Sequence, residues 1–291
     1  MTPSKDSIRL LLASDMSARS DRALDRAEQL TKQFGGELFV VHAVDPSESA
    51  KASRFARPLP SWRQPEQWAM TVTRRLQSDL QDEGVAANVQ VMEAAPAIAV
   101  LGAAKQHGVA LIIGGIAKDD PIGRIQLGST VDKLVREADA PVLTVRRRVH
   151  GPYRHVVVAT DFSSASRAAL ETAVRWFGDS KLSLFHAYPP TGASLEGHHP
   201  VSDSWRALAM NQCEAFLSES KLSTDAASGI SLILEQGYPE NLLPDYVRHA
   251  DVDLVILGTN GRSGLLKALL GSTAESLLHM LECDTMIVRS R

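Results

Sequence analysis

Asp253-Leu254-Val255-Ile256-Leu257 is an apolar run that leads directly into Gly258-Thr259-Asn260-Gly261, and Gly271-Ser272-Thr273 follows after nine further residues. The run predicts a buried strand, and the small hydroxyl residues predict the start of a helix. Glycines let backbone N–H groups approach an anion closely, and a helix start supplies unpaired N–H groups and a positive dipole end. This stretch therefore predicts a strand, loop and helix that cradle a phosphate.

General nucleotide motifs do not fit this cradle. A Walker A loop needs Gly-Lys-Ser/Thr after it, whereas Gly271 is followed directly by Ser272. The glycines at 258, 261 and 264 give G-x-x-G-x-x-G, which differs from the dinucleotide pattern G-x-G-x-x-G. The phosphate hypothesis therefore depends on the whole strand, loop and helix layout.

The same layout occurs earlier in the chain. The run 110–115 precedes a loop that ends in Gly128-Ser129-Thr130, and 10 of 37 positions are identical between 110–146 and 253–289 without a gap. Asp15-Met16-Ser17 likewise matches Asp161-Phe162-Ser163, and His42-Ala43 matches His186-Ala187. Repeats of half a chain indicate two copies of one domain, since solenoid periods are far shorter. We expect domains at 1–148 and 153–291.

Composition restricts the classes of function. The chain has 291 residues, enough for two domains that each bury a core, and its formal net charge of −3 argues against nucleic acid or an anionic membrane as a partner. No signal peptide or apolar run of membrane length is present in the sequence, and Cys213 and Cys283 show no pairing pattern. We therefore expect a cytoplasmic protein with reduced thiols.

Each half is predicted to alternate strands and helices. The first half has predicted strands at 8–13, 38–44, 89–92, 111–114 and 142–145, and helices at 19–34, 65–82, 96–106 and from Ser129. The second half has strands at 155–160, 182–187, 230–234, 254–258 and 285–288, and helices at 164–177, 203–220, 239–249 and 272–281. Apolar strands that alternate with helices predict an α/β fold, with a parallel sheet covered on both faces.

A ligand crevice is expected where the strand order reverses, at the carboxyl ends of the first and fourth strands. In the second half, Asp161 and Gly258 stand at these two places, so the carboxylate could accept a hydrogen bond from a sugar hydroxyl or a ligand amine. The alternative is that Asp161 only caps the following helix, because Asp-x-Ser before a helix is a common start. The aspartate alone does not decide between the two, and the paired glycine loop favours the ligand site.

The pattern G-x2-G-x9-G-[ST] after a fourth strand, with an early Asp and a final Val-Arg strand, resembles the universal stress proteins. The duplication resembles their tandem, E-type members. The resemblance implies, for each half, five parallel strands in the order 3-2-1-4-5 with helices on both faces. It also implies ATP at the crevice of members that keep the glycines, and a regulatory or sensor role in stress.

Carried over by position, the resemblance gives roles to eight residues of the second half. Asp161 would lie near the ribose or adenine, and Ala187 would meet adenine through its backbone. Gly258, Asn260 and Gly261 would approach the phosphates, while Gly271, Ser272 and Thr273 would hold them at the helix start. Magnesium would accompany the ATP, because phosphates usually bring it.

The first half departs from this pattern. Lys118 stands at the position of Gly261, and Asp119, Asp120 and Pro121 follow it. The lysine adds a Cβ where close approach is needed, and the two carboxylates would repel a triphosphate. We therefore expect one nucleotide per chain, in the second half.

No positioned base or catalytic triad is evident, so slow hydrolysis or autophosphorylation at Ser263, Ser272 or Thr273 is the most chemistry expected. No metal site is predicted, and whether the adjacent His198 and His199 bind metal stays open. The alternative to a nucleotide-binding regulator is a non-catalytic scaffold with a vestigial site for a protein partner or an apolar ligand. The protein partner, the stress signal and a homodimeric state are also left open by the sequence.

Overall fold

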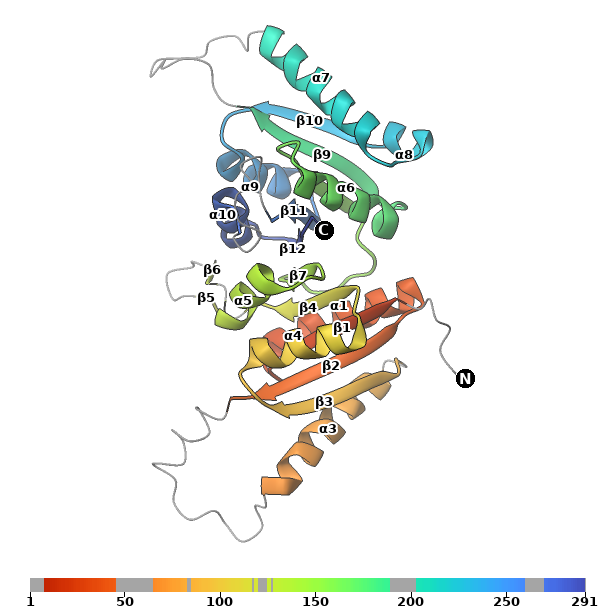
Figure 1. The fold of residues 1–291 in the computed structure, drawn as a ribbon, viewed down its shortest axis with the longest axis vertical. Coiled ribbons are helices and arrows are strands. Elements are labelled where there is room, and N and C mark those ends of the chain that lie inside the picture. The colour runs from red at the N-terminus through yellow and green to blue at the C-terminus, as the bar shows by residue number, and fades with distance from the viewer. Residues whose placement is uncertain are drawn as a thin grey trace. The chain divides into compact units, whose positions relative to one another are not determined.

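The computed structural model describes residues 8–45, 65–82, 85–116, 118–119, 125–126, 128–188, 203–259 and 270–290. It divides into two compact units, one of Met1–Lys118 with Gln126–Pro152 and the other of Asp119–Ile125 with Tyr153–Arg291. Each unit is an α/β domain built on its own parallel strands (Figure 1).

The first unit has five main strands, β1 (Arg9–Ser14), β2 (Glu37–Val44), β3 (Ala87–Glu93), β4 (Leu111–Gly115) and β7 (Val142–Val145). They pair in parallel in the order β3-β2-β1-β4-β7. Leu10 of the central strand β1 pairs with Leu38 on one side and with Leu111 on the other. All three side chains are almost fully buried, as expected for a sheet covered on both faces.

The helices of the first unit end at the signals that the sequence provides. They are α1 (Ala18–Phe34), α3 (Pro65–Asp82), α4 (Pro96–His107) and α5 (Ser129–Glu137). Gly35 and Gly108 follow α1 and α4 with φ of 60° and 58°, the left-handed conformation that glycine adopts most readily. Two short strands, β5 (Lys118–Asp119) and β6 (Ile125–Gln126), pair with each other.

The second unit repeats this plan. Its strands are β8 (His155–Ala159), β9 (Lys181–Tyr188), β10 (Ser231–Gln236), β11 (Leu254–Gly258) and β12 (Asp284–Val288). Its helices are α6 (Ser164–Phe177), α7 (Asp203–Glu219), α8 (Thr224–Ser228), α9 (Pro239–His249) and α10 (Ser272–Met280). The strands lie in parallel in the order β10-β9-β8-β11-β12.

The strand order places the helices on both faces of this sheet. The chain moves outward from β8 to β9 and β10, and then returns across β8 to β11 and β12. Because crossovers between parallel strands are right-handed, the reversal puts α6 and α7 on one face and α9 and α10 on the other. Helix α6 packs on β8 and β11, and α9 packs against α10. The reversal leaves a crevice between the carboxyl ends of β8 and β11.

The predicted fold class and the strand order 3-2-1-4-5 are confirmed in both units. Most predicted elements differ from the observed ones by one or two residues at their ends, and five match in full, namely α3, α6, α9, β7 and β11. The elements α8, β5 and β6 were not predicted. The strands β5 and β6 have two residues each and α8 has five, which is too short for periodicity to reveal.

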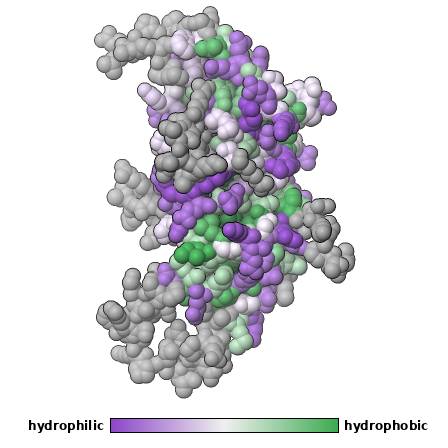
Figure 2. All heavy atoms as spheres, in the orientation of Figure 1, coloured by the Kyte–Doolittle hydropathy of each residue, from purple (hydrophilic) through white to green (hydrophobic). Residues whose placement is uncertain are grey.

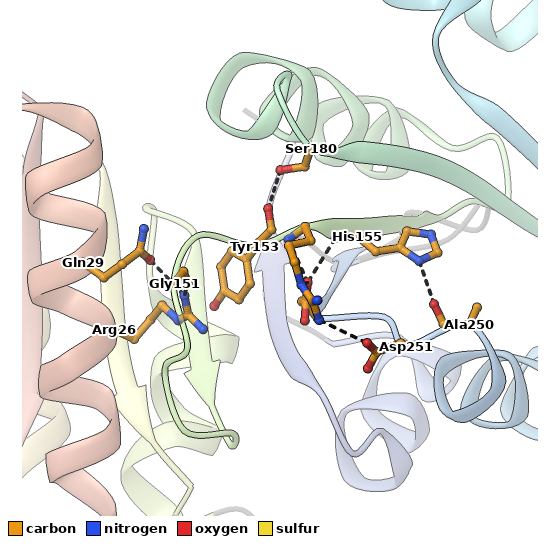
Figure 3. A network of polar contacts seen from close by, with 10 residues as sticks. Arg26, Gln29, Gly151, Tyr153, His155, Ser180, Ala250 and Asp251 are labelled. Atoms are coloured by element: carbon orange, nitrogen blue, oxygen red, sulfur yellow. Dashed lines mark hydrogen bonds and ion pairs between the residues drawn. The ribbon is translucent and has the colours of Figure 1, made fainter.

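Partly buried hydrogen bonds fasten the chain on both sides of Pro152. In the first unit, the Arg26 guanidinium donates to the Gly151 carbonyl over 2.9 Å and to Gln29 over 2.8 Å. In the second unit, the Ser180 hydroxyl donates to the Tyr153 carbonyl over 2.7 Å (Figure 3). On the face drawn in Figure 2, hydrophilic and hydrophobic residues are intermixed over the described surface.

Candidate functional site

The second unit contains a cavity of about 370 Å³ at its strand-order reversal. Its walls come from the carboxyl ends of β8, β9 and β11 and from the first turns of α6, α9 and α10. The lining residues are Ala159, Thr160, Asp161, Ser163, Ser166, Phe185, His186, Ala187, Pro239, Leu257, Gly258, Thr259, Gly271, Ser272, Thr273, Ala274 and Leu277. The volume falls within the range of about 300–1,000 Å³ that small-molecule sites occupy.

Six of the eight predicted site residues line this one cavity. They are Asp161, Ala187, Gly258, Gly271, Ser272 and Thr273. Asn260 and Gly261 lie outside the described residues, as do Ser263, His198 and His199. These residues lie at strand ends that are far apart in the sequence. They become neighbours because the strands are adjacent and parallel in the sheet.

The two ends of the loop between β11 and α10 are joined. The Gly271 N–H donates to the Thr259 carbonyl over 2.7 Å, and the Thr259 N–H donates to Val288 over 3.0 Å. Gly271 is the N-cap of α10 and has no side chain that could accept from the first turn. Because the first N–H groups of a helix have no intrahelical acceptor, those of Ser272 and Thr273 are available to an anion.

Gly258 has a packing role that the sequence analysis did not foresee. A Cβ built at this position would lie 2.7 Å from the carbonyl carbon of Ala165 and 2.8 Å from the nitrogen of Ser166. These distances are shorter than van der Waals contact, so only glycine lets β11 lie this close to the first turn of α6. The predicted reason for this glycine was phosphate approach, whereas the helix contact alone already requires it.

Asp161 forms a turn and does not cap α6 itself. Its Oδ1 accepts from the Ser163 N–H over 3.1 Å. The N-cap is Ser163, whose hydroxyl accepts from the Ser166 N–H over 3.2 Å. The capping alternative is therefore wrong in naming Asp161 as the cap, because the serine two residues later takes that role.

A hydroxyl cluster supports this turn, and the sequence analysis missed it. The Thr160 hydroxyl donates to the Ser166 hydroxyl over 2.9 Å, and it accepts from the Phe162 N–H over 2.9 Å. Thr160, Ser163 and Ser166 all line the cavity. The available signal was the repeat, since Ser14 and Ser20 stand at the matching positions of the first unit and bond to each other over 2.9 Å.

The recurring histidines, His42 and His186, have structural partners. The Nδ1 atom of His186 lies 2.8 Å from the Thr160 carbonyl, and that of His42 lies 2.9 Å from the Ser14 carbonyl. A carbonyl only accepts, so Nδ1 carries the hydrogen in each ring. In each unit, the ring therefore ties the end of the second strand to the end of the first.

The first unit keeps the described part of this architecture. The Asp15 Oδ1 accepts from the Ser17 N–H over 2.9 Å, and Gly128 is the N-cap of α5 with nearly the same backbone angles as Gly271. Lys118 and Asp119 form β5, while Asp120 and Pro121 lie outside the described residues. The two units thus share the turn and the helix start, and their sequences differ between these two elements.

The described residues contain neither a cluster of metal ligands nor a helix able to span a membrane. Within the described ranges, no group of three or more His, Cys, Asp and Glu side chains is placed to hold a metal ion. No helix in the same part of the chain combines the length and the apolar composition that crossing a membrane requires.

The two doubly wound domains define a tandem α/β protein, and the second has a cavity at its strand-order reversal with the volume of a small-molecule site. The chain belongs to the universal stress protein family, whose profile matches residues 8–146 and 152–289. The predicted resemblance to tandem, E-type members is confirmed by these two matches and by similarity to proteins of that type.

Individual relatives match parts of the chain. Universal stress protein E of Salmonella typhi is 43% identical over 56 residues, which is 19% of this chain and 18% of that protein. Universal stress protein E of Photorhabdus laumondii is 23% identical over 193 residues, 59% of each chain. The chain thus matches less than two thirds of the length of either relative.

A solved structure shows the same fold over nearly the whole length. The crystal structure of a putative universal stress protein from Pseudomonas aeruginosa has a TM-score of 0.68 and 21% identity. It covers 97% of this chain and 93% of that chain.

Proposed function

We propose that the second unit binds ATP together with magnesium, and that the protein acts as a regulator or sensor in a stress response. The observation that supports this most is the cavity, which gathers a carboxylate, a strand-end backbone and an uncapped helix start. Asp161 would bind the ribose or adenine, Ala187 would meet the base through its backbone, and the N–H groups of Ser272 and Thr273 would hold phosphate.

The residues present fit such a ligand. The cavity has the volume of a small-molecule site, and α10 begins at its wall without a side-chain cap. Magnesium would screen the phosphate charge, and the described residues supply no dedicated carboxylate cluster for it. Nucleotide bound at this site would change the surface near Thr259 and Gly271. An unidentified protein partner could then distinguish the bound form from the free form.

Strong enzymatic activity is not part of the proposal. Ser272 and Thr273 are exposed on the first turn of α10, so slow autophosphorylation would use their hydroxyls. The buried thiols of Cys213 and Cys283 support a cytoplasmic location, because thiols stay reduced there.

The test is isothermal titration of magnesium-ATP into full-length protein that has been stripped of nucleotide. We expect one site per chain. Asp161→Asn should weaken binding about tenfold or more, because a hydrogen bond to a charged group contributes about 1.5–3 kcal/mol. Asp15→Asn is the matched control, since Asp15 forms the same turn in the first unit, and it should leave the affinity unchanged.

Other outcomes have clear meanings. Two sites per chain would show that the loop from Lys118 to Pro121 does not exclude nucleotide from the first unit. No binding would favour the scaffold function, in which Gly258 persists for helix packing alone. Turnover above about one per second would indicate a true ATP-dependent enzyme.

A further inference from the structure

We propose that Phe162 is a positioning residue that holds the Asp161 carboxylate at the wall of the cavity, an inference that rests on the proposed nucleotide site. Asp161 lines the cavity, whereas Phe162 is not among the lining residues. Any effect of the phenylalanine on a ligand must therefore pass through its neighbours.

The backbone around Phe162 is fixed on both sides. Phe162 has a φ of 65°, in the left-handed region that bulky residues rarely adopt. Its N–H donates to the Thr160 hydroxyl over 2.9 Å, and the following residue, Ser163, donates its N–H to the Asp161 carboxylate over 3.1 Å. The direction of the Asp161 side chain is thus set by a turn whose central residue is Phe162.

The Phe162 ring is held between two elements of the second unit. Its centroid lies 4.2 Å from the ring of His186 on β9 and 5.6 Å from that of Phe216 on α7. His186 is itself tied to the Thr160 carbonyl over 2.8 Å, and Phe216 is buried with the Arg167 guanidinium 5.5 Å from its ring centroid. Contacts between aromatic rings of this kind are geometrically specific, so they resist rotation of the turn.

The first unit provides an internal comparison. Met16 stands at the matching position with a φ of 58°, and the Asp15 turn forms around it. The left-handed turn is therefore common to both units, whereas an aromatic ring at its centre is a feature of the unit with the proposed nucleotide cavity. The ring is therefore the added element in the turn that carries Asp161.

The experiment measures magnesium-ATP affinity for the full chain by titration calorimetry. Phe162→Ala should weaken binding about tenfold, the size expected for losing about 1.4 kcal/mol of aromatic packing. Phe162→Tyr keeps the ring and should bind like the wild type, and Met16→Ala should not change the affinity. In a double-mutant cycle, Phe162→Ala should cost little further affinity once Asp161→Asn is present, because the phenylalanine acts through the carboxylate. If Phe162→Ala does not fold, Phe162→Leu replaces it.

Unchanged affinity in Phe162→Ala, or losses that multiply in the double variant, would overturn the inference. A wild type that binds no nucleotide would overturn the proposed function instead. Hydrogen exchange at the Ser163 amide would then decide the positioning role without any ligand. Exchange should rise about tenfold in Phe162→Ala, consistent with a loss of about 1.4 kcal/mol, and stay unchanged in Met16→Ala. Equal exchange in Phe162→Ala and the wild type would refute the inference.

Discussion

The hydroxyl of Tyr153 donates a hydrogen bond to the Oδ2 atom of Asp284 over 2.7 Å, and both side chains are buried. Tyr153 begins the main segment of the second unit, Tyr153–Arg291, and Asp284 is the first residue of β12. The Tyr153 ring also meets that of Phe177 edge to face, with centroids 5.5 Å apart. The pair therefore fastens the start of the second unit to the sheet at a place that water does not reach.

Tyr153→Phe should lower the stability of the second unit by about 1–3 kcal/mol, because it takes a donor away from a buried carboxylate. Urea unfolding followed by tryptophan fluorescence would measure the change. Tyr238→Phe is the matched control, since Tyr238 is 62% exposed, and it should change the free energy of unfolding by less than about 0.5 kcal/mol. Equal stability of the Tyr153 variant and the wild type would show that the hydrogen bond contributes nothing.

Gly258→Ala should destabilise the second unit by about 2 kcal/mol, because the new methyl group would overlap the backbone of Ala165 and Ser166 at the start of α6. Gly102→Ala serves as the control. Gly102 lies inside α4 with no atom close to its added Cβ, so alanine there should stabilise the first unit by about 0.5–1 kcal/mol. Opposite signs for the two variants are expected in thermal unfolding, and a neutral Gly258→Ala would contradict the packing role.

Acid should weaken the second unit through His155. The Nδ1 atom of His155 donates to the Ala250 carbonyl over 3.1 Å (Figure 3). Its Nε2 atom lies 3.0 Å from the Ser183 hydroxyl, and the side chain is buried. Desolvation by burial lowers the pKa of His155 below its ordinary 6.5. Below pH 6.5 the unfolded chain therefore binds the proton before the folded one does, and stability falls as the pH drops toward the folded-state pKa.

Urea midpoints at pH 7.5 and 5.5 would measure this loss. His155→Gln should reduce the difference between the two midpoints, although it lowers stability at both pH values. His249→Gln is the control, because His249 is exposed on α9, and it should leave the difference as it is in the wild type. An identical pH response in all three proteins would exclude His155 as the group responsible.

Neither cysteine should react in the folded protein. Burial raises the pKa of the Cys213 thiol to about 11, with a further contribution from the charge of Glu214, and Cys283 is fully buried. Because the thiolate is the reactive form, a disulfide reagent such as dithionitrobenzoate should label no thiol at pH 8 and two thiols in guanidinium chloride. Rapid labelling of the native protein would show that α7 or the turn before β12 opens readily.

Much of the fold was predictable because apolar strand segments and helix-starting prolines are clear in the sequence and occur in both halves. The apolar run 254–257 is fully or almost fully buried, as a strand covered on both faces requires, and its counterpart 111–113 behaves in the same way. Pro96 and Pro239 begin helices in both halves, where the missing N–H costs nothing. Because the chain is duplicated, each strand or helix predicted in one half could be checked against the matching segment of the other half. The strand order was predicted separately, from the resemblance to a known family.

The local chemistry of the cavity was less predictable, because it depends on contacts between elements. The sequence around Phe162 does not predict its left-handed backbone conformation. Phenylalanine normally favours φ < 0, and tertiary packing overrides that preference here. The close approach of Gly258 to Ala165 likewise joins positions almost a hundred residues apart. Sequence spacing identified Asp161 and Gly271, whereas the hydroxyls and rings behind them needed the fold.

The packing requirement at Gly258 affects how the glycine motif should be interpreted in duplicated domains. Selection for a sheet that fits against α6 would preserve this glycine in a lineage that had lost every ligand. The presence of this first glycine of the motif therefore does not indicate that a domain still binds a ligand. A comparison that separates domains that bind nucleotide from domains that do not should give the position of Gly258 little weight. It should use the positions that contact only the ligand.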